Sequence, residues 1–358
     1  MKIGVNSRIY QQSNTGIPYY IRCLYDNLLG NAGNLSFVFF QTSFNKKIGN
    51  TKILKLKNIG FLSVLFDLFF VNFLIKREKI NIFHGPANIL PFFKVRGVKY
   101  ILTVHDLSFL IFPNNHSFLF NIYYRYAVAR SLKNADIVVA VSKSTKKDIL
   151  KFYKVPEDKI KVIYSGINDL FLNSQIKEKI IGDKYFLSIT THPKRKNTIG
   201  VLKAMSKNEE LKKYKYVIVG VIPEDQLAEL KNMINELGLA NNVMIFGYAS
   251  EDQLIGLYQN AEFFIYPSFY EGFGFPVLEA MACRCPVITS NNSSLTEIVP
   301  DKIWLVDPNN IDDISQRMTK IIKLSREDRY KLVDYNYNFS NKFRWKKTAS
   351  EYIKLFKI

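Results

Sequence analysis

The sequence has little cysteine, and this excludes a disulfide framework. Its 358 residues include three cysteines, Cys23, Cys283 and Cys285. One residue separates the last two, which is not a zinc-ligand spacing. We therefore expect reduced, buried thiols in a reducing compartment. Met1 leads directly into an apolar strand with no secretory signal, so we expect a cytoplasmic protein.

A long apolar segment is also missing. The most apolar stretch, residues 61–75 (FLSVLFDLFFVNFLI), contains Asp67 and Asn72. A membrane-spanning helix needs about 20 apolar residues, so this stretch is too short to cross a bilayer. Two interpretations stay open. It is either a buried helix or an amphipathic face that contacts the anionic inner face of the cell membrane, with Lys76, Arg77 and Lys79 near the headgroups.

Acidic residues are scarce relative to basic ones. Lysine and arginine number 50 against 31 acidic residues, which gives a formal net charge of +19. Such a charge indicates compositional bias, an anionic substrate, a membrane surface or nucleic acid. The cations form no block of five or six, and no recognition helix or aromatic-basic RNA motif is visible. We therefore expect no nucleic-acid partner, although a non-catalytic basic binding protein remains an alternative.

The glycine fingerprint of dinucleotide-binding proteins is missing as well. An NAD-dependent oxidoreductase would carry G-x-G-x-x-G directly after its first strand and an acidic residue about 20 residues later. The segment between the expected strand 2–6 and Gly16 supplies neither. No D-x-D pair with neighbouring acids follows a strand either, so we expect that no metal is required and that there is no cofactor.

What the sequence does contain is an alternation of apolar strands and helices in two halves. This alternation predicts a mostly parallel α/β sheet in each half. A polar, lysine-rich stretch at 173–183 separates the halves, which predicts domains at 1–170 and 171–341. A helix at 344–356 would follow them. The expected strands are 2–6, 37–41, 79–83, 100–104, 135–141 and 161–164, then 185–190, 216–219, 243–246, 263–266 and 287–289.

Residues 261–300 carry the clearest functional pattern. An apolar run and Pro267 precede the turn Glu271-Gly272-Phe273-Gly274, and Pro276 then opens a helical pattern. The glycines allow close approach of a ligand, and the helix start beyond them offers backbone N–H groups to an anion. Glu271 lies before the turn and Glu279 in the first helical turn after it. An anion-binding turn with an acidic residue on each side predicts a ligand in which sugar hydroxyls lie on both sides of a diphosphate.

This E-x7-E pattern, followed by EAMACRCPVITS, resembles the signature of the family 4 (GT4) retaining glycosyltransferases. The resemblance implies the GT-B fold: two Rossmann-like domains that face each other across a cleft, with a C-terminal helix (about 342–358) crossing back to the first. It also implies retaining transfer of a hexose from an NDP-sugar to a glycan acceptor. We expect that acceptor to be a lipid-linked O-antigen, lipopolysaccharide or capsule precursor.

The resemblance assigns roles in the donor half of the reaction. Glu271 would contact the transferred sugar and Glu279 the ribose, with the backbone from Gly272 through Phe273 and Gly274 to Phe275 near sugar and phosphate. Arg195-Lys196-Asn197 is similar to the family's R-K-N, whose cations bind the diphosphate. Cations aimed at a departing diphosphate stabilise the transition state more than the ground state.

The resemblance says less about the other half of the reaction. His105-Asp106, after the expected strand 100–104, is similar to the family's H-D, whose His faces the donor sugar. His105, Glu271 and Lys196 are the expected catalytic residues. Gly16 and Tyr19 would border the acceptor. His84 lies in a His-Gly-Pro turn that is either functional or a packing turn.

Several properties stay open at this stage. No general base presents itself, and the nucleoside base, the sugar, the acceptor, the linkage and the oligomeric state are not specified. Because mannose and related sugars are common in the resembled subgroup, GDP-mannose is the first expectation for the donor. A GT-B-fold NDP-sugar epimerase remains an alternative.

Overall fold

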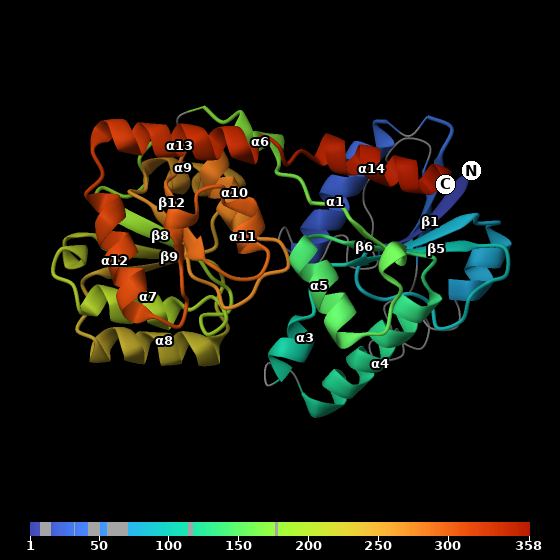
Figure 1. Cartoon of the computed structure of the whole chain (residues 1–358), viewed down its shortest axis with the longest axis horizontal. Helices are drawn as coiled ribbons and strands as arrows, with labels where there is room; N and C mark the ends of the chain where they lie inside the picture. The colour runs from blue at the N-terminus through green and yellow to red at the C-terminus, as the bar shows by residue number, and fades with distance from the viewer. Residues whose placement is uncertain (8–15, 32, 42–50, 56–70, 114–116, 176–177) are drawn as a thin grey trace. The chain divides into compact units, whose positions relative to one another are not determined.

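The computed structural model describes residues 1–7, 16–31, 33–41, 51–55, 71–113, 117–175 and 178–358 (Figure 1). The chain divides into two compact units: residues 1–166 together with 343–358, and residues 167–342. Each unit holds one parallel sheet with helices on both faces. The predicted fold class of two Rossmann-like α/β units is confirmed.

The first unit is built on a seven-stranded sheet with the order β3-β2-β1-β4-β5-β6-β7. All described neighbours pair in parallel, and the direction of strand addition reverses beside β1. The strands are β1 (Lys2–Asn6), β2 (Ser36–Gln41), β3 (Thr51–Lys55), β4 (Ile82–Gly85), β5 (Lys99–Val104), β6 (Ile137–Ala140) and β7 (Ile160–Val162).

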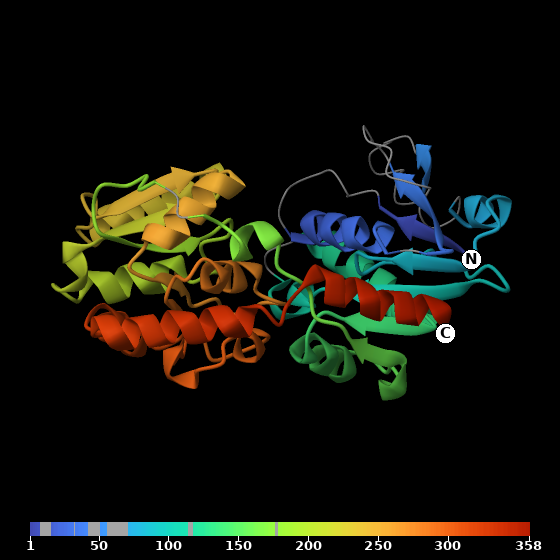
Figure 2. The same ribbon diagram turned by 90° about the horizontal axis from the view of Figure 1, so that it is seen from above.

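The last helix of the chain belongs to this first unit. Helix α14 (Trp345–Lys357) lies beside α1 (Gly16–Leu29), as Figures 1 and 2 show. Tyr352 and Phe356 of α14 are buried there. The expected return of the C-terminal helix to the first domain is confirmed. The remaining helices are α3 (Ser108–Ile111), α4 (Phe118–Asn134), α5 (Lys143–Phe152) and the 3-10 turn η2 (Glu157–Lys159).

The second unit repeats the strand order in a six-stranded sheet, β10-β9-β8-β11-β12-β13. Rings of Phe186, Tyr216 and Phe263 stack across its centre, with centroids 4.9 and 5.0 Å apart. This stack makes the middle of the sheet a packed apolar layer. The strands are β8 (Tyr185–Ile189), β9 (Lys215–Val219), β10 (Val243–Gly247), β11 (Phe264–Tyr266), β12 (Val287–Ser290) and β13 (Leu305–Val306).

Local sequence explains where several of its helices begin and end. Ser250 and Gln253 form a capping box at the start of α9, and Gly238, with φ +66°, follows the end of α8. The helices are α6 (Asp169–Leu172), α7 (Thr198–Ser206), α8 (Glu224–Glu236), α9 (Glu251–Asn260), α10 (Phe275–Ala282), α11 (Leu295–Ile298), α12 (Ile311–Ile322) and α13 (Arg326–Ser340), with 3-10 turns η3 (Leu211–Lys213) and η4 (Lys302–Trp304).

Three strand predictions need correction. Strands β3 and β13 were not predicted. Both lie at a sheet edge, where little apolar pattern is expected: β13 has two residues, and three of the five residues of β3 (TKILK) are polar. The third expected strand begins at Ile82 rather than Lys79, since Lys79 adopts φ +52° in a turn after a helical segment at 71–77.

The apolar stretch 61–75 lies mostly outside the described residues. At its described end, Val71, Leu74 and Ile75 are buried in the first core, whereas Phe73 is exposed. Among the helices that the structure describes, none has the length and apolar character that crossing a bilayer would require.

Candidate active site

The predicted donor-binding residues follow the two central strands of the second sheet. Strand β8 leads to Arg195 and Lys196, and its neighbour β11 leads to Glu271. The direction of strand addition reverses between these two strands. Ligands of open α/β sheets bind at the carboxyl ends of the strands at such a point. The topology therefore brings together two motifs that are 75 residues apart in sequence.

Lys196 and Glu271 form a buried ion pair. The Lys196 Nζ lies 2.5 Å from Glu271 Oε1, and each side chain is 10% exposed. The Tyr266 hydroxyl also accepts a hydrogen bond from Lys196, and its ring centroid lies 4.7 Å from Nζ. Ser268 Oγ donates to Glu271 Oε1 at 2.6 Å. A buried ion pair persists only with such additional hydrogen bonds, because burial removes the water that would solvate both charges.

The neighbouring cations keep Glu271 ionised. Burial alone would raise its pKa, but the charges of Lys196 and Arg195 and the hydrogen bonds from Lys196 and Ser268 hold the pKa below its usual value. The pKa of Tyr266 is raised, first by burial and then by the Glu271 charge, so its hydroxyl stays protonated. The cluster is thus a carboxylate, an ammonium group and a neutral phenol.

The turn after Glu271 depends on glycine. Gly274 has φ +111°, and a Cβ atom there would lie 2.7 Å from Cδ1 of Ile298. A larger residue would therefore meet both backbone strain and a clash. Ser294 Oγ reaches the backbone oxygens of Glu271 (2.9 Å) and Phe273 (2.8 Å), and holds the turn from the opposite loop.

Helix α10 starts directly after this turn, with Pro276 in its first turn as predicted. The rings of Phe273 and Phe275 lie edge to face, 5.1 Å apart, and Phe273 is buried. Glu279 is the fifth residue of α10, so it begins the second helical turn rather than lying in the first. This correction follows from the helix starting one residue before Pro276.

Glu279 has a different electrostatic setting from Glu271. Burial first, and then the Glu251 carboxylate, raises the pKa of Glu279 to about 8. Tyr258 Oη lies 3.5 Å from its Oε2 atom. The two acids of the motif therefore differ, since Glu279 holds its proton near neutral pH and Glu271 does not.

The basic residues at positions 194–196 have different surroundings. Lys194 Nζ lies 2.8 Å from Glu229 Oε2, where both side chains are exposed. Arg195 is half-buried, and its backbone oxygen accepts from Phe269 N at 3.0 Å, which ties this loop to the one after β11. Asn197, with φ +56°, caps α7. Of the two neighbouring lysines, only Lys196 contacts Glu271.

His105 lies in the first unit, directly after β5. Its Nε2 atom is 2.7 Å from the Pro86 carbonyl oxygen, and its backbone N–H donates to Asn88 Oδ1 at 2.8 Å. Burial lowers the pKa of His105. Because a carbonyl can only accept, Nε2 carries the proton of the neutral ring and Nδ1 remains an acceptor.

His84 is a packing residue. Its ring is fully buried, with Nδ1 2.5 Å from Tyr25 Oη and Nε2 2.8 Å from Thr103 Oγ1. Tyr352 Oη of α14 lies 2.6 Å from that threonine hydroxyl and 2.7 Å from Tyr20 Oη. Burial lowers the pKa of His84 to about 3. This neutral network anchors α14 and favours the packing interpretation of the His-Gly-Pro turn.

The predicted acceptor-side residues lie at the start of α1. Gly16, with φ +63°, is its first residue and has open space where a Cβ would be. Tyr19 is 5% exposed, and its ring lies 6.5 Å from that of Trp345. The acceptor role of both residues stays a prediction.

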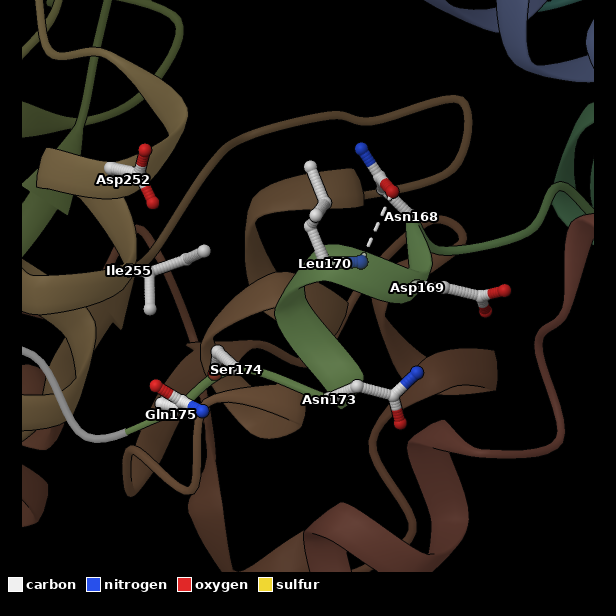
Figure 3. A pocket seen from close by; sticks show the side chains of 8 residues that line it. All are labelled: Asn168, Asp169, Leu170, Asn173, Ser174, Gln175, Asp252 and Ile255. Atoms are coloured by element: carbon white, nitrogen blue, oxygen red, sulfur yellow. Dashed lines mark hydrogen bonds between the residues drawn. The ribbon is translucent and has the colours of Figure 1, made fainter.

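A separate pocket of about 510 Å³ lies between α6 and α9 (Figure 3). Polar side chains line most of it, including Asn168, Asp169, Asn173 and Asp252. None of its lining residues is a predicted donor contact, so we assign the pocket no part in the site.

Sequence reasoning missed the residues that hold the cluster in place. Tyr266, Ser268 and Ser294 were not singled out, although each contacts Glu271 or its neighbours. The available signal was position: Tyr266 is the last residue of β11, at the edge of the sheet where ligands bind.

The chain matches two adjoining family models. The first, described as "Glycosyl transferases group 1", covers residues 172–339, and the second, "Glycosyltransferase Family 4", covers residues 50–169. The chain belongs to the group 1 glycosyltransferases. The resemblance drawn from the E-x7-E motif is therefore confirmed. The transferase assignment is confirmed with it.

Known proteins similar to this glycosyltransferase support the same conclusion. The O-antigen chain mannosyltransferase B of Escherichia coli is 29% identical over 294 residues, which cover 78% of this chain and 75% of that protein. The serotype-specific mannosyltransferase WbdA of Escherichia coli is 28% identical over 281 residues, 74% of this chain but 33% of that protein. Because these relatives are transferases, the epimerase alternative is set aside.

A solved structure shows the same fold over the whole chain. The crystal structure of Anabaena Alr3699/HepE in complex with UDP and glucose aligns with a TM-score of 0.74 and 16% identity, covering 100% of this chain and 99% of that chain. The GT-B fold class predicted from the sequence is thereby confirmed.

Proposed function

We propose that this group 1 glycosyltransferase transfers a hexose from an NDP-sugar to a lipid-linked glycan acceptor, with retention at the anomeric carbon. The observation that carries the proposal is the Lys196–Glu271 pair at the carboxyl ends of β8 and β11, beside the start of α10. A cation, a carboxylate and a helix start suit a diphosphate attached to a sugar.

In the proposed reaction the bond from the sugar C1 to the β-phosphate oxygen breaks, and a bond from C1 to an acceptor oxygen forms. The departing diphosphate gains negative charge. Lys196, Arg195 and the backbone at the start of α10 would stabilise that charge more than the ground state. We propose that the leaving phosphate oxygen accepts the acceptor proton, since no side chain is assigned as the base.

Two carboxyl groups would form hydrogen bonds with the donor. Glu271, which is ionised, accepts hydrogen bonds from hydroxyls of the transferred sugar. Glu279 takes the ribose hydroxyls. The role proposed for His105 is contact with the transferred sugar through its Nδ1 acceptor atom, since Nε2 donates to the Pro86 carbonyl. Lys196 lies on Glu271 and neutralises its charge. A bound diphosphate would also interact with Lys196. Oxygen lone pairs of Glu271 would then be available to accept hydrogen bonds from the sugar hydroxyls.

Mannose is the proposed sugar and GDP-mannose the first donor to test. The support comes from the two Escherichia coli relatives, whose names describe mannosyltransferases. A lipid-linked O-antigen-type precursor is the proposed acceptor for the same reason. We further propose that the enzyme acts in the cytoplasm at the inner face of the membrane and requires no metal or cofactor.

The test is a transfer assay with GDP- and UDP-sugars, a lipid-linked acceptor and a shortened water-soluble acceptor, with and without EDTA. We expect product from GDP-mannose, unchanged by EDTA. A matched thermal-shift series with GDP and UDP should raise Tm for the nucleotide that the native state binds. Lack of transfer with every donor would overturn the proposed function, and full loss in EDTA would overturn its metal independence.

A further inference from the structure

Helix α4 (Phe118–Asn134) carries its large apolar side chains on the solvent side. Phe118 and Leu119 are 76% and 77% exposed, and Ile122 and Tyr126 are exposed as well. A surface helix normally buries its apolar stripe and exposes its polar one. Three of the six residues that α4 buries are instead polar: Asn121, Ser131 and Asn134.

The exposed side chains form one stripe. Phe118, Ile122 and Tyr126 are spaced by four residues, so they lie above one another on a single helix face, and Leu119 lies beside them. The stripe continues past the helix, because the Tyr126 ring lies 5.9 Å from that of Phe92. We call Phe118, Leu119, Ile122 and Tyr126 the α4 stripe.

Other exposed apolar side chains in the described chain are more scattered. Tyr330 and Tyr335 on α13 and Ile303 on η4 are examples in the second unit. Isolated exposed apolar residues are normal, whereas a contiguous patch marks a surface that contacts another apolar phase.

Basic residues outnumber acidic ones in the segment that contains α4. Residues 86–136 contain six cations, Lys94, Arg96, Lys99, Arg125, Arg130 and Lys133, and two acids, Asp106 and Asp136, of which Asp136 pairs with Lys94 at 2.6 Å. Helix α4 itself has no acidic residue, and Arg125 and Lys133 are exposed on it. Arg130 lies with its guanidinium carbon 5.0 Å from the Phe92 ring centroid, so this cation stays at the edge of the apolar surface.

We propose that the α4 stripe inserts into the surface of an anionic lipid bilayer. Exposed aromatic and aliphatic side chains gain free energy when they leave water for the apolar region of a membrane interface. Basic side chains beside them gain attraction from anionic headgroups. The positive border favours this occupant over a second copy of the chain, whose own border would repel it.

The inference rests on the proposed function, because a lipid-linked acceptor lies at a membrane and contact with that membrane would bring the enzyme to it. It does not depend on the stretch 61–75, which was the lipid-facing candidate from sequence. The described end of that stretch is buried in the core, whereas the α4 stripe is exposed.

Vesicle flotation tests the proposal on the full chain. Wild-type protein is mixed with vesicles of phosphatidylcholine alone or of phosphatidylcholine with phosphatidylglycerol, and the partition coefficient is measured. We expect strong binding to the anionic vesicles. The triple variant Phe118→Ser/Leu119→Ser/Ile122→Ser should lower the partition coefficient at least about tenfold, because the apolar area that enters lipid is lost.

Two further variants separate the contributions. The control Ile303→Ser/Tyr330→Ser/Tyr335→Ser removes an equal number of exposed apolar residues from the second unit and should leave the partition coefficient unchanged. The variant Arg125→Glu/Lys133→Glu keeps the α4 stripe and should reduce binding to the anionic vesicles only. Near-ultraviolet circular dichroism checks that each variant is folded.

The outcomes also distinguish this proposal from the proposed function. Transfer to the water-soluble acceptor should be the same in wild type and triple variant, while transfer to the lipid-linked acceptor in vesicles should fall. Wild-type protein that does not float, or a triple variant that floats like wild type, overturns the membrane proposal. A stripe-dependent dimer in sedimentation, without vesicle binding, would assign the surface to a second copy. Failure of transfer to both acceptors in wild type would instead overturn the proposed function.

Discussion

The two sheets share one strand order but carry different polar groups near the point where that order reverses. In the second unit, the ends of β8 and β11 carry an ion pair, Lys196 and Glu271, with a second cation at Arg195. In the first unit, strand β4 carries His84, which is neutral and fully buried in a hydrogen-bonded network.

The difference shows that topology places a crevice but does not decide its chemistry. The Tyr352 hydroxyl of α14 lies within hydrogen-bond distance of Thr103 Oγ1 on β5 and completes the network of the first unit. The last helix of the chain therefore satisfies polar groups that would otherwise be available to a ligand. In the second unit the groups that follow β8 and β11 are charged, and keeping charges buried requires several hydrogen bonds. We therefore interpret the first cluster as structural and the second as functional.

The largest expected effect comes from Glu271→Ala. Loss of this carboxylate should lower kcat/KM for transfer by about 10²–10³-fold, the range seen when one transition-state contact is removed. It also leaves Lys196 buried without its partner, which should destabilise the fold by about 3–5 kcal/mol. Transfer kinetics and urea unfolding measure the two effects.

Glu229→Ala is the matched control for Glu271→Ala, because Glu229 pairs with Lys194 on the exposed surface. Removing an exposed ion pair should change stability by less than about 1 kcal/mol and leave kcat/KM unchanged. Full activity in Glu271→Ala would contradict the functional interpretation of the second cluster.

Acidification should destabilise the hydrogen-bonded cluster around His84 in the first unit. The pKa of His84 is 6.5 in the unfolded chain and about 3 in the native protein. The unfolded state therefore binds more protons between these values, so stability is complete above the unfolded pKa and is lost as pH falls toward 3, with a slope of up to about 1.4 kcal/mol per pH unit.

The variant His84→Gln isolates this effect, since its amide does not titrate. It should be less stable than wild type at neutral pH, and the difference should shrink as pH falls. Urea unfolding across that range measures it. A difference that stays constant with pH would show that His84 is not held neutral.

Tyr352→Phe should separate stability from donor binding. The substitution removes the hydroxyl between Tyr20 and Thr103 and leaves two buried groups without this partner. We expect a loss of about 1–3 kcal/mol in the free energy of unfolding. Calorimetric affinity for the nucleoside diphosphate should not change. A large loss of affinity instead would assign the first cluster to the donor site.

The next prediction concerns Glu279 and has the opposite sign to that for His84. Its pKa rises from 4.5 to about 8 on folding, so the native state binds more protons between these values and stability falls as pH rises through this window. Glu279→Gln should remove that part of the pH dependence. Thermal melts from mildly acidic to mildly alkaline pH measure it, and an unchanged slope would contradict the raised pKa.

The sequence predicted most of the second cluster because its signals are local. Glu271, Gly274 and Pro276 lie within one strand-turn-helix segment, where glycine and proline have clear positional meaning. Lys196 was found from the R-K-N resemblance. The hydrogen bonds that Tyr266 and Ser294 make could not be predicted, since they depend on which loops the fold brings together.

The first unit was harder to predict for the same reason. Strand β3 (Thr51–Lys55) is a short edge strand with a polar pattern, and the His84 network joins four elements that are distant in sequence. Which face of helix α4 is buried is decided by the sheet on which it packs. Sequence periodicity reports an apolar stripe but not the side on which it lies.

The most direct test of the central claim is calorimetric titration of GDP and UDP into wild type, Lys196→Ala and Lys194→Ala. These lysines are two residues apart, but Lys196 is buried on Glu271 and Lys194 is exposed on Glu229. We predict that Lys196→Ala weakens binding of the preferred nucleotide at least about tenfold, because it removes a desolvated charge from the diphosphate, while Lys194→Ala changes affinity less than about twofold. Equal affinities in wild type and Lys196→Ala, or equal weakening in both variants, would contradict the assignment of this cluster to the donor diphosphate.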